Sequence, residues 1–134
     1  MPGMAAYTKL NFKQDVEDMA PKFGYSPGAE SRFARVPLGL EQSGVSYFKL
    51  APGFRFPFGH THGEQEEVYV VISGNAVLRL DDDEMALERL DAVRIPAGTK
   101  RAMQGGPDGC ELLAFGAPNT ENKDAEMLPG WWGD

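Results

Sequence analysis

The chain has 134 residues, the usual size of one compact domain and enough to bury a hydrophobic core without disulfides or structural metals. Apolar residues make up 42% of it and charged residues 25%, which excludes an intrinsically disordered chain. The net charge of -7 and the lack of Lys/Arg clusters argue against binding to nucleic acids or to anionic membrane surfaces.

Cysteine content and hydropathy bear on the cellular compartment. Cys110 is the single cysteine, so no intrachain disulfide can form, as is typical of a reducing compartment. The first residues hold no basic segment followed by an apolar run, and no stretch approaches the roughly 18 apolar residues of a membrane span. No repeat or linker divides the sequence. We therefore expect a cytoplasmic protein with one domain over residues 1–134.

One short helix is predicted near the N-terminus. Apolar residues recur there at the spacing of one helix face, namely Val16, Met19, Ala20 and Phe23. Asp15 is placed to cap this helix, and Pro21 and Gly24 limit it to about two turns.

The rest of the chain is predicted to form short strands separated by turns. The strand segments are 45–50, 68–72, 76–80, 84–90, 92–95 and 110–115. Segment 84–90 fits a helix or a strand by periodicity, and its short length favours a strand. Residues 73–75 predict a hairpin, and 81–83 and 105–109 predict further turns. This spacing indicates an all-β barrel or sandwich.

The segment 119–134 is polar until it reaches Trp131 and Trp132. Two tryptophans near a chain end are costly to leave in water. We expect them to cover an opening of the barrel, to lie in a subunit contact, or simply to pack on the outside of the domain.

Both histidines of the chain occur in the pattern His60-Thr61-His62. On a strand, residues i and i+2 point to the same face, so the two imidazoles converge. Glu67 begins the next strand and can turn back toward them, whereas Glu66 would face away. Two His and one carboxylate can hold a divalent metal and leave positions open for substrate.

The residues around the histidines predict a pocket for a small molecule. Even-numbered positions before His60 carry phenyl rings, at Phe54, Phe56 and Phe58. If Pro57 and Gly59 do not interrupt the strand, these rings form an apolar wall beside the imidazoles. Tyr69 and Val71 share the face of Glu67, and we expect them to line the pocket or to pack in the core.

The sequence around the histidines resembles the first motif of the cupins. That motif runs glycine, five residues, His-x-His, three or four residues, glutamate, six residues, glycine. Here it is formed by Gly53, the histidine pair, Glu67 and Gly74, and only the first spacer differs, by one residue. The resemblance implies a jelly-roll barrel (a double-stranded β-helix) with its core at about 30–117. The N-terminal segment 5–24 and the tail 118–134 would then pack on the barrel or on a partner.

Residues 90–105 resemble the second cupin motif through the turn of Pro96 and Gly98. They depart from it at Leu90 and Gly105, where cupins have Gly and Asn, and at Arg101, where cupins have their fourth metal ligand, a histidine. The resemblance implies iron, manganese, nickel or zinc at the site, a small-molecule ligand and a homodimer.

Arg101 leaves two interpretations of the site open. In one, His60, His62 and Glu67 hold the metal and Arg101 binds an anionic substrate with an apolar body, in an enzyme of oxygenase or isomerase type. In the other, no metal is bound, and Arg101 pairs with Glu67 in a non-catalytic ligand-binding or structural protein. Gln104 is expected at the substrate pocket and is a conceivable oxygen ligand in place of the missing histidine.

Overall fold

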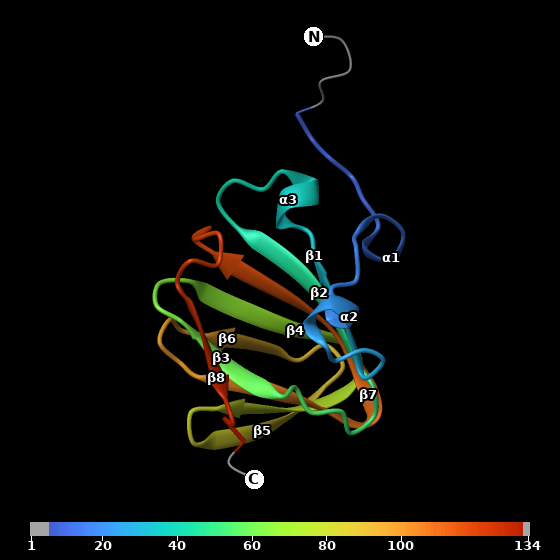
Figure 1. Ribbon diagram of the computed structural model, residues 1–134, viewed down its shortest axis with the longest axis vertical. Helices are drawn as coiled ribbons and strands as arrows, with labels where there is room; N and C mark the ends of the chain where they lie inside the picture. The colour runs from blue at the N-terminus through green and yellow to red at the C-terminus, as the bar shows by residue number, and fades with distance from the viewer. Residues whose placement is uncertain (1–5, 133–134) are drawn as a thin grey trace.

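Eight strands pair into one sheet that curls round on itself, in a computed structural model that describes residues 6–132 (Figure 1). The strands are β1 (Ala29–Phe33), β2 (Gly44–Leu50), β3 (Phe58–His62), β4 (Glu66–Leu80), β5 (Asp83–Glu88), β6 (Ala92–Ile95), β7 (Arg101–Ala117) and β8 (Ala125–Pro129). Three helices accompany them in this part of the chain, α1 (Phe12–Asp15), α2 (Ala20–Phe23) and α3 (Arg35–Leu38). The all-β jelly-roll class predicted from the sequence is confirmed.

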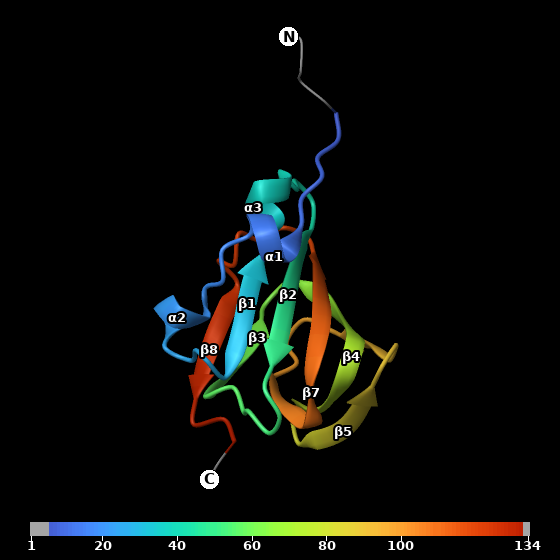
Figure 2. The same cartoon turned by 90° about the vertical axis from the view of Figure 1, so that its right-hand side faces the viewer.

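The two long strands β4 and β7 pair in an antiparallel ladder that forms a large part of the barrel. Its register runs from Glu66 opposite Ala117 to Leu80 opposite Arg101. β2 adds to β7 and β1 adds to β2, so that β1, β2, β7 and β4 lie side by side (Figure 2). β5 and β6 both pair with β4, and β3 lies between β7 and β8.

The hairpin predicted at residues 73–75 is wrong, because β4 continues through this segment. The ladder with β7 instead shifts register between Gly74 and Ala76, where residues 106–109 bulge out opposite Asn75. Asn75 bonds to Asp108 at the bulge. Gly74 has a φ of 72°, and any side chain there would collide with the carbonyl oxygen of Gly109. The turn-forming residues of this segment therefore mark a β-bulge in a long strand pair.

The single N-terminal helix predicted from the sequence is also wrong, because the segment forms two helices of four residues each. Asn11, and not Asp15, caps the first helix. The chain is then extended, and Asp18 bridges to Arg32 of β1. The carboxylate of Asp18 accepts hydrogen bonds from the backbone N–H groups of Ala20 and Ser31, so pairing with β1 replaces helix there.

The tail that follows residue 118 contributes a strand that its polar composition did not reveal. β8 pairs with β3, and the two tryptophans then pack on the same barrel. Trp131 lies against Gly59 and under the guanidinium of Arg79, and Trp132 donates its indole N–H to the carbonyl of Phe56 at 2.8 Å. The tail therefore completes one wall of the barrel.

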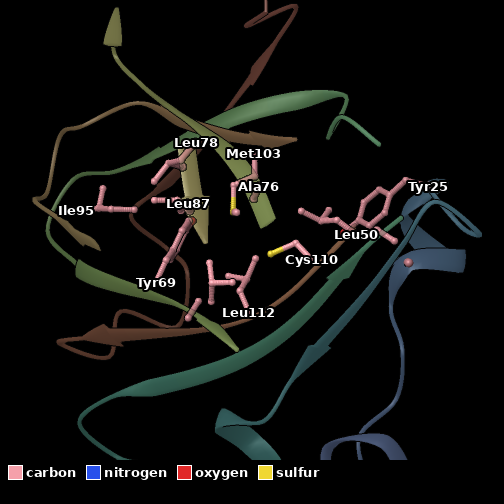
Figure 3. Packing of buried hydrophobic residues seen from close by; sticks show 14 residues of the cluster. Tyr25, Leu50, Tyr69, Ala76, Leu78, Leu87, Ile95, Met103, Cys110 and Leu112 are labelled. Atoms are coloured by element: carbon pink, nitrogen blue, oxygen red, sulfur yellow. The ribbon is translucent and has the colours of Figure 1, made fainter. Parts of the chain in front are cut away.

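The hydrophobic core occupies the barrel interior, with Ile95 and Tyr25 at opposite ends of the cluster in Figure 3. Tyr69, Leu112 and Cys110 lie between them and are buried. No helix in the described part of the chain has the length and apolar character needed to cross a membrane.

Candidate metal centre and ligand cavity

β3 brings the two imidazoles to one point, as their spacing predicts. The rings of His60 and His62 lie 5.2 Å apart and nearly perpendicular, at 86°. Their Nε2 atoms are 3.7 and 3.5 Å from the same oxygen, Oε1 of Glu67. The three side chains thus place their ligand atoms within 4.8 Å of one another.

Glu67 enters the site from β4 because side chains alternate along a strand. Its side chain is 13% exposed, whereas that of Glu66 is 57% exposed and pairs with Arg94 at 2.9 Å on the outer face. Of the two neighbouring carboxylates, only Glu67 therefore faces the histidines, as its position in the strand indicates.

Arg101 pairs with Glu67 inside the barrel. Its side chain is fully buried, and Nη2 donates to Oε1 of Glu67 at 2.9 Å. Nη1 donates to the carbonyl oxygen of Thr99 at 2.7 Å, while Nε has no hydrogen-bond partner among the described residues. Because the guanidinium is enclosed and bonded to both groups, Arg101 holds the carboxylate of Glu67 in place.

The charges of the site follow from burial and from this ion pair. Burial lowers the pKa of His60, and the positive charge of Arg101 lowers it further. The hydrogen bond with Glu67 acts in the opposite direction but does not outweigh them. Burial alone would raise the pKa of Glu67, but the hydrogen bond from His60 and the charge of Arg101 outweigh it and lower the pKa. At neutral pH the site thus holds a neutral imidazole, a carboxylate and a guanidinium.

Asp124 orients His62, although the sequence gives no sign of it. Its carboxylate lies 3.2 Å from Nδ1 of His62, and it accepts hydrogen bonds from the backbone N–H groups of Glu64 and Gln65 and from the Thr120 hydroxyl. Burial would raise the pKa of Asp124, but these hydrogen bonds lower it well below its usual range. An ionised Asp124 keeps the proton of His62 on Nδ1 and leaves Nε2 free to accept or to bind a metal.

The donor set fits a divalent transition metal. The contacts of Arg101 and of both imidazoles with Glu67 all use Oε1, and a carboxylate has room for about four such contacts. Two imidazoles and one carboxylate on one side of a metal leave its other positions open. The neighbouring cation of Arg101 would weaken the binding of the metal compared with a neutral fourth ligand.

A cavity of about 550 Å³ lies in front of these side chains. Its walls include the aromatic side chains of Phe23, Tyr25, Phe33, Phe48, Phe56, Phe58 and Tyr69. The volume falls within the range of roughly 300–1,000 Å³ of small-molecule pockets. The predicted apolar wall beside the histidines is present from Phe56 onward, while Phe54 packs against Tyr25.

Val71 takes the core alternative that the sequence left open, and Gln104, which was expected at the pocket, lies outside it. Val71 is fully buried in the hydrophobic core, and Gln104 accepts a hydrogen bond from Arg55 at 3.0 Å, so neither lines the cavity. Gln104 bridges to Arg55 in the sheet and is thereby held away from the histidines.

The family of the chain follows from its match to known sequences. Residues 46–115, more than half of the chain, match the family model described as the cupin domain. The chain therefore belongs to the cupin family, and the resemblance of its two motifs is confirmed. No curated protein matches the sequence.

Solved cupin structures share the fold. A cupin protein from Bacteroides fragilis is 24% identical with a TM-score of 0.71, over 87% of this chain and 88% of its own. Oxalate decarboxylase from Bacillus subtilis has a TM-score of 0.77 at 20% identity, over 97% of this chain but only 34% of that enzyme. PAC13 from Streptomyces, solved with uridine, has a TM-score of 0.71 at 15% identity over 93% of each chain. At these identities the likeness concerns the fold alone.

Proposed function

We propose that the protein is a metal-dependent cupin enzyme that acts on a small molecule with an apolar body, by a reaction of oxygenase or isomerase type. The observation that carries this proposal is the convergence of His60, His62 and Glu67 at the wall of an aromatic cavity. A bound iron, manganese, nickel or zinc ion would supply Lewis-acid or redox chemistry at the positions left open.

Each side chain of the site has a distinct task in this proposal. His60 and His62 offer neutral nitrogen donors, and Asp124 fixes the orientation of the second ring. Glu67 supplies the negative charge, and Arg101 holds its carboxylate in place. The aromatic walls bind the apolar part of the substrate and keep water away from the reacting end.

The structural neighbours support a small-molecule role. One of them is named for the decarboxylation of oxalate, and another was solved with uridine. Both proteins share the fold in which the cavity of this chain lies. Fold alone does not fix a reaction, so the substrate must be sought from the side chains that line the cavity.

A second candidate function rests on the ion pair between Arg101 and Glu67. The guanidinium of Arg101 lies 2.9 Å from the carboxylate of Glu67 and neutralises its negative charge. A bound metal would otherwise compensate that charge. In this candidate the barrel binds its ligand without a metal and without turnover. The imidazoles then only donate and accept hydrogen bonds within the cavity.

Metal content separates the two candidates. The full chain is purified without chelators, and its metals are measured by elemental analysis beside the double variant His60→Ala/His62→Ala. The first candidate predicts about one transition metal per chain, lost in the double variant and retained in the control Glu66→Gln. Trace metal that is the same in the parent and the double variant would contradict the enzyme proposal and support the metal-free binding protein.

A further inference from the structure

A row of backbone positions connects Glu67 with Arg35 across three strands. Gly116 of β7 pairs with Glu67 of β4 on one side and with Gly44 of β2 on the other. The stem of Arg35, on α3, lies over Gly44, 3.9 Å from the position of a Cβ atom there. Adjacent strands are about 4.8 Å apart, so the backbone of Gly44, which Arg35 covers, lies about 10 Å across the sheet from that of Glu67.

The two glycines keep the surface between Arg35 and Glu67 free of larger side chains. Gln65 reaches over it, with its amide against Gly116 and its Nε2 donating to the carbonyl of Pro118 at 3.3 Å. Arg35, Gln65 and Glu67 all line the cavity. They form a polar strip in a cavity whose walls also carry many aromatic side chains.

Arg35 is the charged side chain of the cavity that has no partner. Within residues 6–132, four residues with charged side chains line the cavity, namely Arg35, Glu67, Arg101 and Glu121. Glu67 and Arg101 neutralise each other, and Glu121 pairs with Lys123 at 3.4 Å. No described carboxylate lies within ion-pair distance of Arg35.

We propose that Arg35 binds the carboxylate of the ligand of this cavity, and that the ligand is an aromatic or apolar carboxylic acid. Its carboxylate would lie at the Gly44 side of the strip, and its other end would reach Glu67. A guanidinium matches the two oxygens of a carboxylate. The acidic Glu121 on the cavity wall and the net charge of -7 disfavour a doubly charged phosphate. The inference rests on the proposed function in one respect, namely that the end of the ligand near Glu67 is the end that reacts.

This proposal moves the anion-binding role from Arg101 to Arg35. The sequence offered Arg101 for that role because it stands in the motif. Both arginines line the cavity, but Arg101 is fully buried and bonded to Glu67 and Thr99, whereas Arg35 is half-buried and pairs with no described carboxylate. A substrate would thus meet a free guanidinium at one end and the histidine pair at the other.

Matched acid and amide probes test the proposal. Metal is first removed from the full chain with a chelator, so that no carboxylate can bind to a metal. The affinities of trans-cinnamate and of its uncharged amide, trans-cinnamamide, are then measured by calorimetry. We expect the parent to bind the acid at least about tenfold more tightly than the amide. Arg35→Gln should abolish that preference, and Arg35→Lys should keep part of it.

The control is Arg89→Gln, which removes the same charge from an exposed position outside the cavity. It should bind both probes as the parent does. Equal affinity of the parent for acid and amide, no binding of cinnamate at millimolar concentration, or a preference that survives Arg35→Gln would overturn the proposal. Because metal-free protein is used, a failure of the metal-enzyme proposal would leave this result interpretable.

Discussion

Arg101 lies directly opposite His60 in the ladder between β7 and β3, and both side chains reach the same oxygen of Glu67. The guanidinium therefore occupies the position from which a fourth ligand would complete the site. This relationship makes Arg101 the residue that most directly controls the affinity for a metal.

Replacing Arg101 with histidine should strengthen metal binding. The variant Arg101→His removes a buried cation and places a nitrogen donor across from His60. We expect its affinity for Ni²⁺ to rise at least about tenfold, about 1.4 kcal/mol, in a calorimetric titration of the metal-free chain. The exposed neighbour Lys100→His is the control and should leave the affinity unchanged. An unchanged affinity in Arg101→His would show that position 101 lies too far from the metal to act as a ligand.

The role of Asp124 as a positioning residue predicts a weaker site when its charge is removed. In Asp124→Asn the side chain keeps its shape but loses the negative charge that favours the proton of His62 on Nδ1. Loss of such a partner should lower the affinity for Zn²⁺ by about 10- to 100-fold. Thermal unfolding of the same variant checks that the fold is retained, and Asp82→Asn, in an exposed turn, serves as the control. Equal affinities of the parent and Asp124→Asn would refute this role.

A hydrogen bond distant from the cavity predicts a pH-dependent contribution to stability. The buried Tyr47 hydroxyl donates to Glu111, which also accepts from Ser73. Burial and the nearby Glu111 raise the pKa of Tyr47, so its hydroxyl stays a donor. Its hydrogen bond, with that of Ser73, lowers the pKa of Glu111 below the ordinary 4.5. A lowered carboxylate pKa gives stability that is present above 4.5 and lost as the pH falls through the folded-state value.

The variant Tyr47→Phe removes this hydroxyl and little else. We expect a loss of about 1–2 kcal/mol of unfolding free energy at pH 7, measured with urea. The difference from the parent should shrink as the pH is lowered below 4.5, because protonation of Glu111 weakens the bond in the parent. The exposed Tyr7→Phe is the control. A loss that is the same at pH 3 and pH 7 would argue that packing, and not this bond, is responsible.

The parts of the site that were predictable depend on local periodicity. The alternation of side chains along a strand placed His60, His62 and Glu67 together and turned Glu66 outward. The same rule found Tyr69 on the cavity wall. For Val71, which shares the face, the alternative of packing in the core is the one observed.

The residues that were missed are those brought in by long-range contacts. Asp124 is 62 positions from His62, and nothing in the polar segment around it marks a functional residue. Arg35 belongs to a helix of four residues that no periodicity reveals. β8 went unpredicted because pairing with β3, and not its own composition, makes it a strand. The homodimer and the cytoplasmic location stay predictions, and light scattering at micromolar concentration tests the first.

The most direct test of the metal centre is an anomalous difference map at the zinc edge, from crystals of the full chain grown with Zn²⁺. The account predicts one strong peak about 2.1 Å from Nε2 of both His60 and His62, next to the carboxylate of Glu67. No peak between the two imidazoles, or a peak only at the acidic turn 81–84, would contradict it.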